Sequence, residues 1–536
     1  MDLSFAPELG PTSRAPRGKR SRARTPKVDN RASLTNQPGV SREYEAGSQS
    51  RRLHGWRPRS SRPNDLLGSL ATLRDRSRQA TRNDGYAKGV LDKLVTNIIG
   101  TGVTPLPQTA DRDLAKRITD AWLEWTDQSD ADGLLDFYGQ QGQSTRCWLD
   151  AGDCFIRRRD RLPSDGLRVP MQVQVLEPEL CPHTYNGMAA NGNRIRAGIE
   201  FDLIGRRVAY YFHPSRPDLD DFDASLLKRV SADAVAPMFD PLRAGQIRGI
   251  PVLTPALIRL HELDKFDDAT LLKQELQNLF VAFIKRDATN DGSAPVHPLT
   301  GQPYQTTATG EPPSLSMEPG IIQELNPGEE MQFSAPPGVQ NGYVDFYRQQ
   351  LRAVCVSSGV PYEILTGDMG SLNDRTARIV LNEFKRRIQM IQHQIIAFQL
   401  CRRVWRWFMD AAYFAGSFPI PDDYLLDPRP YLAVKWMPQR WAYVHPVQDV
   451  DADKAAIRAG FTSRSDVVSE YGEDAEAIDQ QQADDNARAD KLGLRYDSDG
   501  RQPAAGPKES FTEGGTTTDP TADPNNTDPA SPAPAN

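Results

Sequence analysis

The 536-residue sequence contains no long apolar run. A helix that crosses a membrane needs roughly 20 consecutive, mostly apolar residues, and no stretch approaches that length. The N-terminal residues MDLSFAPELGPTSRAP do not show the basic start and apolar segment of a secretory signal. We therefore expect no membrane among the partners, and a protein that stays in the compartment where it is made.

The familiar catalytic motifs are also missing. The sequence has no GxxxxGK[ST] loop for nucleotide phosphates, no GxSxG elbow, no HExxH pair and no DxDxDG calcium loop. Its seven histidines are dispersed, and His393 falls within a predicted helix, where a packing or surface role is expected. We therefore expect a protein that is not an enzyme, with no catalytic residue and no cofactor.

Cysteine is scarce and unpatterned. The five cysteines form no CxxC pair, and an odd, scattered number favours reduced thiols in a protein core. Cys181 and His183 could supply two ligands to a metal ion, but nothing nearby completes a tetrahedral set. We therefore expect no metal site.

Charge is distributed unevenly around a net value of −7. Residues 1–62 carry 14 Lys and Arg against 5 Asp and Glu, and residues 451–536 carry 8 against 18. The basic N-terminal segment has few apolar residues, so it is either a solvated, disordered tail or an arm that contacts nucleic acid or an assembly partner. The Pro/Thr/Ala/Asp segment 496–536 is also expected to be disordered.

Between these ends the patterns predict an α+β body. Apolar spacing predicts helices over 64–100 and from about Asp111 to Trp125. Strand patterns follow, and Gly205-Arg206 fits a hairpin turn between the last two of them. The predicted strands are 173–178, 196–202 and 208–213.

Three further segments alternate between helix and irregular chain. Residues 252–286 carry leucines at three- and four-residue steps, which predicts a long helix. Residues 287–338 contain nine prolines and six glycines, a density that excludes a helix. Helical spacing returns from Tyr343 to Ser358 and stops at Gly359-Val360-Pro361.

The longest predicted element runs from Thr376 to Ala415. Apolar residues from Phe384 to Ala412 recur at steps of three and four, which predicts one stripe on a helix of about 40 residues, roughly 60 Å long. Asn373 or Asp374 is suited to cap its start, and Gly416 to end it. Such a helix is long for a lone domain but can pack against neighbours in a ring of subunits.

Fragments throughout the chain resemble the lambda-type family of phage portal proteins. The resemblance covers about residues 64 to 496, and one departure exists, because SLNDRTAR stands where many relatives have an Asn-Tyr-Ser-Ser-x-Arg run. Nine fragments carry it in order: ATRNDGYAKGVLDKLVTNIIGTGVTP, AGDCF, VQVLEPE, GIEFDLIGRRVAYYFH, RAGQIRGIPVLTPAL, LNPGEEMQFSAPP, GVPYEILTGD, NDRTARIVLNEFKRR and HPVQDVDADKAAIRAGFTSRSDVVSEYGED.

The resemblance implies a multi-subdomain portal fold with wing, stem, clip and crown, a long central helix and disordered termini. The segments then map as follows: 1–62 basic arm, 63–251 wing, 252–286 first stem helix, 287–340 clip, 341–365 second stem helix, 366–375 tunnel loop, 376–415 long helix, 416–495 C-terminal part of wing and crown, and 496–536 acidic tail.

The resemblance also implies a function and a set of partners. The chain would form a homododecameric ring at one capsid vertex of the virion, after assembly in the host cytoplasm. Double-stranded DNA would pass through its channel during packaging and ejection. The implied protein partners are the terminase large subunit, head-completion and tail connector proteins, and the major capsid and scaffold proteins. Two alternatives remain open, a minor capsid or assembly protein that binds DNA through its basic arm, and a metal-dependent nuclease.

Two groups of residues are predicted to carry this function. The tunnel loop would meet DNA through Met369, Gly370, Ser371, Leu372, Asn373 and Arg375. Asp374 and Arg375 are equally suited to cap and pair within the start of the helix. Packing between subunits is expected from the stripe residues Phe384, Ile388, Ile391, Ile395 and Trp405.

Overall fold

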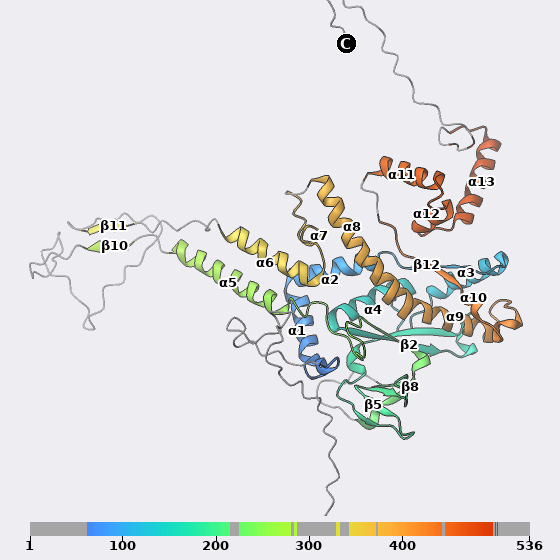
Figure 1. Ribbon diagram of the computed structural model, residues 1–536, viewed down its shortest axis with the longest axis horizontal. Helices are drawn as coiled ribbons and strands as arrows, with labels where there is room; N and C mark the ends of the chain where they lie inside the picture. Colours follow the sequence, from blue (N-terminus) through green and yellow to red (C-terminus); the bar gives the residue numbers. More distant parts are fainter. Residues whose placement is uncertain are drawn as a thin grey trace, which may run out of the picture. The chain divides into compact units, whose positions relative to one another are not determined.

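A computed structural model, shown in Figure 1, describes most of the chain between its two ends. Contacts divide the chain into Met1–Ser61 and Arg62–Asn536, and all the described residues lie in the second part. The basic arm, most of the clip and most of the acidic tail lie outside the described residues. The described residues are 62–214, 224–279, 283–286, 329–332, 342–370, 373–441, 445–496, 499 and 501.

The first helical segment is divided in two, where the sequence predicted one helix over 64–100. Helix α1 (Leu70–Asn83) ends at Asp84, and α2 (Gly85–Ile98) begins directly after it. Asp84 has extended backbone angles, and its carboxylate accepts hydrogen bonds from the backbone N–H groups of Tyr86 and Ala87 at 2.7 and 3.1 Å. An aspartate at this position stabilises a helix start, so the N-cap of α2 interrupts the predicted helix.

A three-stranded antiparallel sheet lies at the centre of the body, in the order β3-β2-β9. Its strands are Met171–Leu176 (β3), Asp153–Asp160 (β2) and Val235–Phe239 (β9). Helix α4 (Phe137–Ala151) packs against all three strands. The sequence predicted β3 but neither α4 nor β2.

A second, five-stranded antiparallel sheet is a meander in the order β4-β5-β6-β7-β8. The predicted hairpin is confirmed, because β6 pairs with β7 and Gly205 has φ of 83°, the left-handed conformation that glycine adopts readily. The strands are Gly187–Met188 (β4), Arg194–Arg196 (β5), Ile199–Phe201 (β6), Arg207–Phe212 (β7) and Lys228–Ser231 (β8).

Helices α5 (Leu257–Leu279) and α6 (Tyr343–Ser358) pack side by side, as Figure 1 shows. Phe266 of α5 contacts Tyr343 and Phe346 of α6, with ring centroids 5.9 and 5.2 Å apart. The predicted helix over 252–286 is corrected at its end, because Phe283–Arg286 (β10) is a strand paired with Glu329–Gln332 (β11). Helix α6 has the predicted bounds and ends at Gly359.

The predicted long helix is continuous, but its middle has a wider turn. It consists of α8 (Asp374–Ile391), the π-helical segment η8 (Gln392–Cys401) and α9 (Arg402–Ala415). Gly416 ends it with φ of 62°. π-helical turns are rare and occur mostly as short insertions in α-helices, so the three- and four-residue periodicity could not reveal this one.

Short elements complete the described chain. Strands β1 and β12 pair antiparallel and join distant parts of the sequence. Their bounds and those of the remaining helices are Thr104–Pro107 (β1), Arg112–Thr126 (α3), Tyr362–Thr366 (α7), Arg429–Leu432 (α10), Val434–Met437 (β12), Pro446–Arg458 (α11), Arg464–Glu470 (α12) and Ala475–Leu492 (α13). The 3-10 turns are Asp65–Gly68, Pro163–Asp165, Pro178–Leu180, Ala224–Leu226, Ala232–Ala234 and Asp422–Leu425.

The main core is built around clustered aromatic rings from α3, α4 and α9. The Trp122 ring lies 5.0 Å from that of Trp405 and 5.3 Å from that of Phe137. All five cysteines carry free thiols, and four of them are buried. Within the described residues, no helix is both long and apolar enough to cross a membrane.

Candidate functional site

The predicted tunnel loop connects α7 to α8 (Figure 1). Helix α7 ends at Gly367, which has φ of 74° and donates its N–H to the carbonyl of Glu363. Helix α8 begins after Asn373, whose side chain accepts hydrogen bonds from the N–H and hydroxyl of Thr376 at 2.9 and 2.6 Å. Both ends of the loop are therefore held by helix caps.

Asp368 fixes the first half of this loop to the neighbouring helices. Its carboxylate lies 3.4 Å from Arg348 of α6 and accepts a hydrogen bond of 3.2 Å from the hydroxyl of Tyr362 in α7. It also accepts a bond of 3.3 Å from the N–H of Gly370. Asp368 was not among the predicted site residues, although it belongs to the fragment GVPYEILTGD.

The structure places the six predicted loop residues in different surroundings. Met369, Gly370 and Arg375 are exposed, and Met369 is 57% accessible to solvent. Asn373 is exposed but caps α8, so the first of the two predicted capping residues fills this role. Ser371 and Leu372 lie outside the described residues.

The five stripe residues of the long helix are buried within one chain, which corrects the expectation that they pack between subunits. Their exposed fractions lie between 0 and 8%. Phe384 contacts Trp441, and Trp405 contacts Trp122 and Trp436. The body of the same chain surrounds this helix, so little of these side chains is left to contact a second copy. The residues are Phe384, Ile388, Ile391, Ile395 and Trp405.

A buried ion network lies where α1 meets the central sheet. Asp153 of β2 pairs with Arg74 of α1 at 2.6 Å and with the Nε atom of Arg248. Burial acts to raise the pKa of Asp153, but the charges of Arg248 and Arg74 outweigh it and hold that pKa below its usual value. Asp153 is therefore ionised at neutral pH.

Arg248 also forms hydrogen bonds with backbone carbonyl groups in the chain segments next to the second sheet. It donates hydrogen bonds to the carbonyl groups of Cys181, Ala197 and Pro178 at 2.8, 3.1 and 3.1 Å. All the donors of a guanidinium group can be used in this way. Arg248 thereby links the two sheets through one buried side chain.

Two glycines allow two backbone segments to lie against one another beside this network. A Cβ atom on Gly249 would lie 1.8 Å from the carbonyl oxygen of Gly152, and one on Gly152 would lie 2.6 Å from the backbone of Ile250. Both glycines adjoin the paired residues, in AGDCF and in QIRG. The network thus gives a physical reason for two of the fragments on which the family resemblance rests.

The described part of the chain contains no cluster of side chains that could hold a metal ion. No group of three or more His, Cys, Asp or Glu residues there has the geometry to hold a metal ion. Burial raises the pKa of the Cys181 thiol to about 11 and lowers the pKa of His183 to about 4. A protonated thiol is a poor metal ligand.

Comparison with known proteins identifies the chain. The family described as "Phage portal protein, lambda family" matches residues 49–392. A "Probable portal protein" of Halomonas phage phiHAP-1 is 25% identical over 85% of this chain and 89% of that protein. The "Portal protein B" of Escherichia phage lambda is 20% identical over 62% of this chain and 67% of that protein.

Solved structures show a weaker likeness. A chain from the neck of a native GTA particle, computed with C12 symmetry, has a TM-score of 0.42 and 12% identity, over 74% of this chain and 91% of that one. A chain from the virion of a native gene transfer agent has a TM-score of 0.41 and 13% identity, over 78% and 94%.

A match over more than half of the sequence defines the class, the portal proteins of phages. The chain belongs to the lambda family of phage portal proteins. It is a portal protein, as the fragments in its sequence predicted.

Proposed function

We propose that twelve copies of this chain form a closed ring at one vertex of the capsid and that the genome enters and leaves through the central channel. Family membership over residues 49–392 carries this proposal, because the matched region contains α5 to α7, the loop and all of α8. Ring closure needs two different surfaces on each copy whose repeated rotation returns to the start.

The loop 366–375 would face DNA in the channel. Its end nearest α7 is fixed by Asp368, and its other end is fixed by the Asn373 cap, while Met369 stays exposed. Few cations in the loop suit this role, because phosphate contacts by Lys and Arg release counterions and strengthen binding. A channel that lets the duplex slide benefits from weak contacts.

Residues 287–340 would carry the surface on which the terminase large subunit docks, followed by the head-completion and tail connector proteins. This segment lies between α5 and α6, and recognition residues are commonly found on loops held by a fixed scaffold. The ring would assemble in the host cytoplasm with the scaffold and major capsid proteins, and it would act as a channel rather than as an enzyme.

Electron microscopy and mass photometry of the purified protein test the proposal. We expect rings with a central hole and a mass of about twelve chains of 59.7 kDa. A deletion of residues 290–315 should leave these rings intact and block DNA packaging. Monomers alone at micromolar concentration, with or without added salt, would contradict the ring, and normal packaging by the deletion variant would contradict the docking segment.

A further inference from the structure

Cys147 and Cys154 lie next to one another where β2 follows α4. Cys147 belongs to the last part of α4, and Cys154 is the second residue of β2. The chain turns between them at Gly152, which has φ of 93°. The two thiols share a hydrogen bond, and the Cys147 thiol also donates to the carbonyl of Asp153 at 3.9 Å. Two sulfur atoms therefore meet across one tight turn of the chain.

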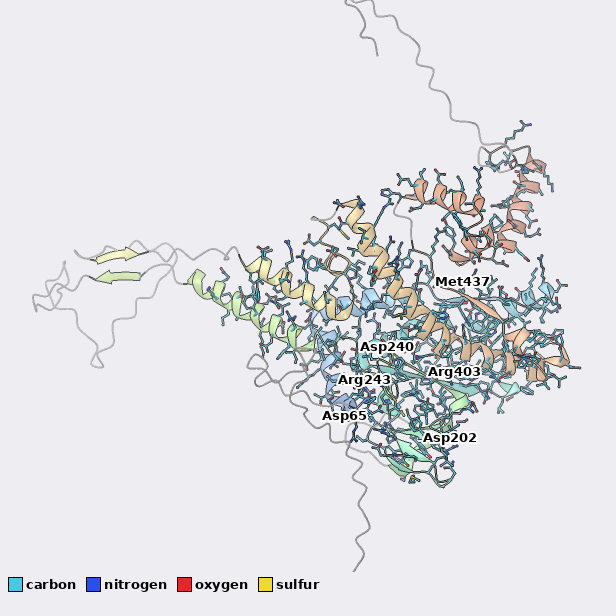
Figure 2. All side chains as sticks on the ribbon, viewed as in Figure 1. Asp65, Asp202, Asp240, Arg243, Arg403 and Met437 are labelled. Atoms are coloured by element: carbon cyan, nitrogen blue, oxygen red, sulfur yellow. The ribbon has the colours of Figure 1, made fainter. Side chains whose placement is uncertain are left out.

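The two thiols differ in their access to solvent. Cys154 is fully buried, lies opposite Met238 of β9 and donates to the carbonyl of Leu176 at 3.7 Å. Met238 stands two residues before Asp240, which Figure 2 labels. Cys147 is half-buried, so a reagent in solution reaches Cys147 before it reaches Cys154.

The other three cysteines lie on separate elements and are all buried. Cys181 donates to the carbonyl of Gly198 at 3.7 Å, and Cys401 accepts a hydrogen bond from the side-chain amide of Gln141 at the same distance. Cys355 lies on α6. Cys147 is thus set apart from these thiols, because it is partly open to solvent and its neighbour is a second thiol.

Thiols arranged in this way are suited to form a disulfide. The side chains of Cys147 and Cys154 already face one another, and the bond would enclose only eight residues. A disulfide requires such facing side chains, with Cα atoms about 4.4–6.8 Å apart. A metal ion would need more ligands, and no group of three or more His, Cys, Asp or Glu residues in the described part of the chain has the geometry to hold one.

We propose that Cys147 and Cys154 are a reversible redox pair, reduced while the chain assembles and joined by a disulfide under oxidising conditions. Thiols stay reduced in the cytosol, whereas disulfides persist on virions and in other oxidising environments. The change of environment rests on the proposed function, because it requires that the protein leaves the host cell within a particle. The chemistry of the pair does not depend on that function.

The oxidant is a small-molecule disulfide of the glutathione type. The thiolate of Cys147 attacks one of its sulfur atoms, the S–S bond of the small molecule breaks, and one small thiolate leaves and takes up a proton. Cys154 then loses its proton and attacks the Sγ atom of Cys147, which releases the second small thiol. The protein loses two protons and two electrons in total, and the small disulfide becomes two thiols.

The second step is the slow one. Burial, together with the neighbouring Cys147, raises the pKa of the Cys154 thiol well above its usual value. Because the thiolate is the form that attacks, little of Cys154 is ready to react at neutral pH. We therefore expect the mixed disulfide on Cys147 to form first and the bond between the two cysteines to follow.

The bond would fix the end of α4 to the strand that carries Asp153. This carboxylate is the centre of the buried ion network with Arg74 and Arg248. A cross-link restricts the unfolded chain and so favours the folded one. The oxidised protein should therefore melt several degrees above the reduced protein, and a reducing agent should abolish the difference.

Peptide mapping tests the pair directly. The purified protein is incubated with oxidised glutathione at about pH 8, where more of a thiol is ionised, and the remaining thiols are then alkylated in denaturant. Trypsin places both cysteines in one peptide, because Arg146 precedes Cys147 and Arg157 follows Cys154. In the oxidised protein this peptide should lack both alkyl groups, and it should carry both after treatment with dithiothreitol.

Single substitutions separate the two steps. Cys154→Ala should stop at the mixed disulfide, so that Cys147 keeps one glutathione. Cys147→Ser, at the half-buried position, should leave Cys154 reduced and available for alkylation after unfolding. Cys355→Ala is the matched control and should form the bond as the unmodified protein does, since Cys355 lies on α6.

The results distinguish this inference from the proposed function. Two alkyl groups on the peptide from the oxidised wild-type protein, or a product that remains the mixed disulfide, would overturn the redox pair whether or not rings form. Formation of the disulfide in a protein that gives no rings would support the pair and count against the proposed function.

Discussion

Asp153 and Arg248 form a buried ion pair across 95 residues of sequence. Asp153 lies on the central sheet, and Arg248 binds the carbonyl groups of the chain that leads into the five-stranded sheet. A second arginine, Arg74, reaches the same carboxylate from α1. One carboxylate therefore joins α1, the central sheet and the chain that leads into the five-stranded sheet, and its loss affects all three.

Replacing Asp153 with Asn should destabilise the protein by about 3–5 kcal/mol, because two arginines would stay buried without a counter-charge. The free energy of unfolding, measured by urea denaturation at neutral pH, gives the result. Asp160→Asn is the matched control, since Asp160 ends the same strand but is exposed, and it should change stability by less than about 0.5 kcal/mol. Equal effects of the two substitutions would show that the buried network contributes little.

Glu200 should make the protein less stable in acid. Its hydrogen bond with Arg229, together with those from Asn191, Asn193 and Tyr211, lowers its pKa from 4.5 to about 2. The depressed pKa stabilises the fold above the value of the unfolded chain, and this contribution is lost as the pH falls from about 4.5 toward 2.

Glu200→Gln should therefore flatten the fall in unfolding free energy between about pH 5 and pH 3. Urea denaturation at several pH values in this range measures the slope. Glu383→Gln, which alters an exposed carboxylate on α8, should keep the slope of the unmodified protein. An unchanged slope in Glu200→Gln would mean that other carboxylates dominate the acid response.

The long helix offers a matched pair of substitutions on its two faces. Ile388 is fully buried and Ile379 is 63% exposed. Ile388→Ala should lower the free energy of unfolding by about 2–5 kcal/mol, because it leaves a cavity in the core. Ile379→Ala should cost less than about 0.5 kcal/mol. Similar losses at the two positions, by chemical denaturation, would contradict the assignment of the stripe to the core of one chain.

If the loop 366–375 faces DNA as proposed, a lysine in it should slow the passage of DNA, because it adds a cation beside the phosphates. Leu372→Lys is the informative substitution, since Asn373 caps α8 and is best left in place. The length of the packaged genome and the retention of DNA at different salt concentrations are both measured in assembled heads. Both should differ from the values of the unmodified protein. Lys454→Ala, on the exposed surface of α11, is a control. Unchanged packaging and retention in Leu372→Lys, with rings intact, would mean that the loop does not face DNA.

Apolar periodicity predicted the helices whose buried faces are apolar. Helix α6 has the predicted bounds, and α3 is displaced by about one residue. Helix α4 was missed because much of its buried face is polar: Gln140, Gln141, Ser144 and Thr145 are all buried. Gln141 pairs with the backbone N–H and C=O groups of Val103 at 2.8 and 3.1 Å. A pattern of hydrophobic residues cannot report such a helix.

The sequence predicted that a loop precedes the long helix, but it did not predict the contacts that hold this loop. The glycines and the helix stop located the loop, whereas the pairing of Asp368 with Arg348 and Tyr362 depends on tertiary structure. The same holds for the stripe residues, because periodicity identifies a buried face but not what covers it. A ring interface and the core of one chain give the same sequence pattern.

The pairing of β1 with β12 has a consequence for the synthesis of the protein. The hydroxyl of Thr104 binds the carbonyl of Met437, 333 residues later. At typical rates of translation, roughly 20 seconds to a minute separate the appearance of these two strands. The rings of α3 and α4 also lack their partners until α9 (Arg402–Ala415) has been made. A product that terminates before residue 402 therefore exposes an open strand edge and half a core, and we expect such a fragment to aggregate instead of entering a ring as a defective subunit.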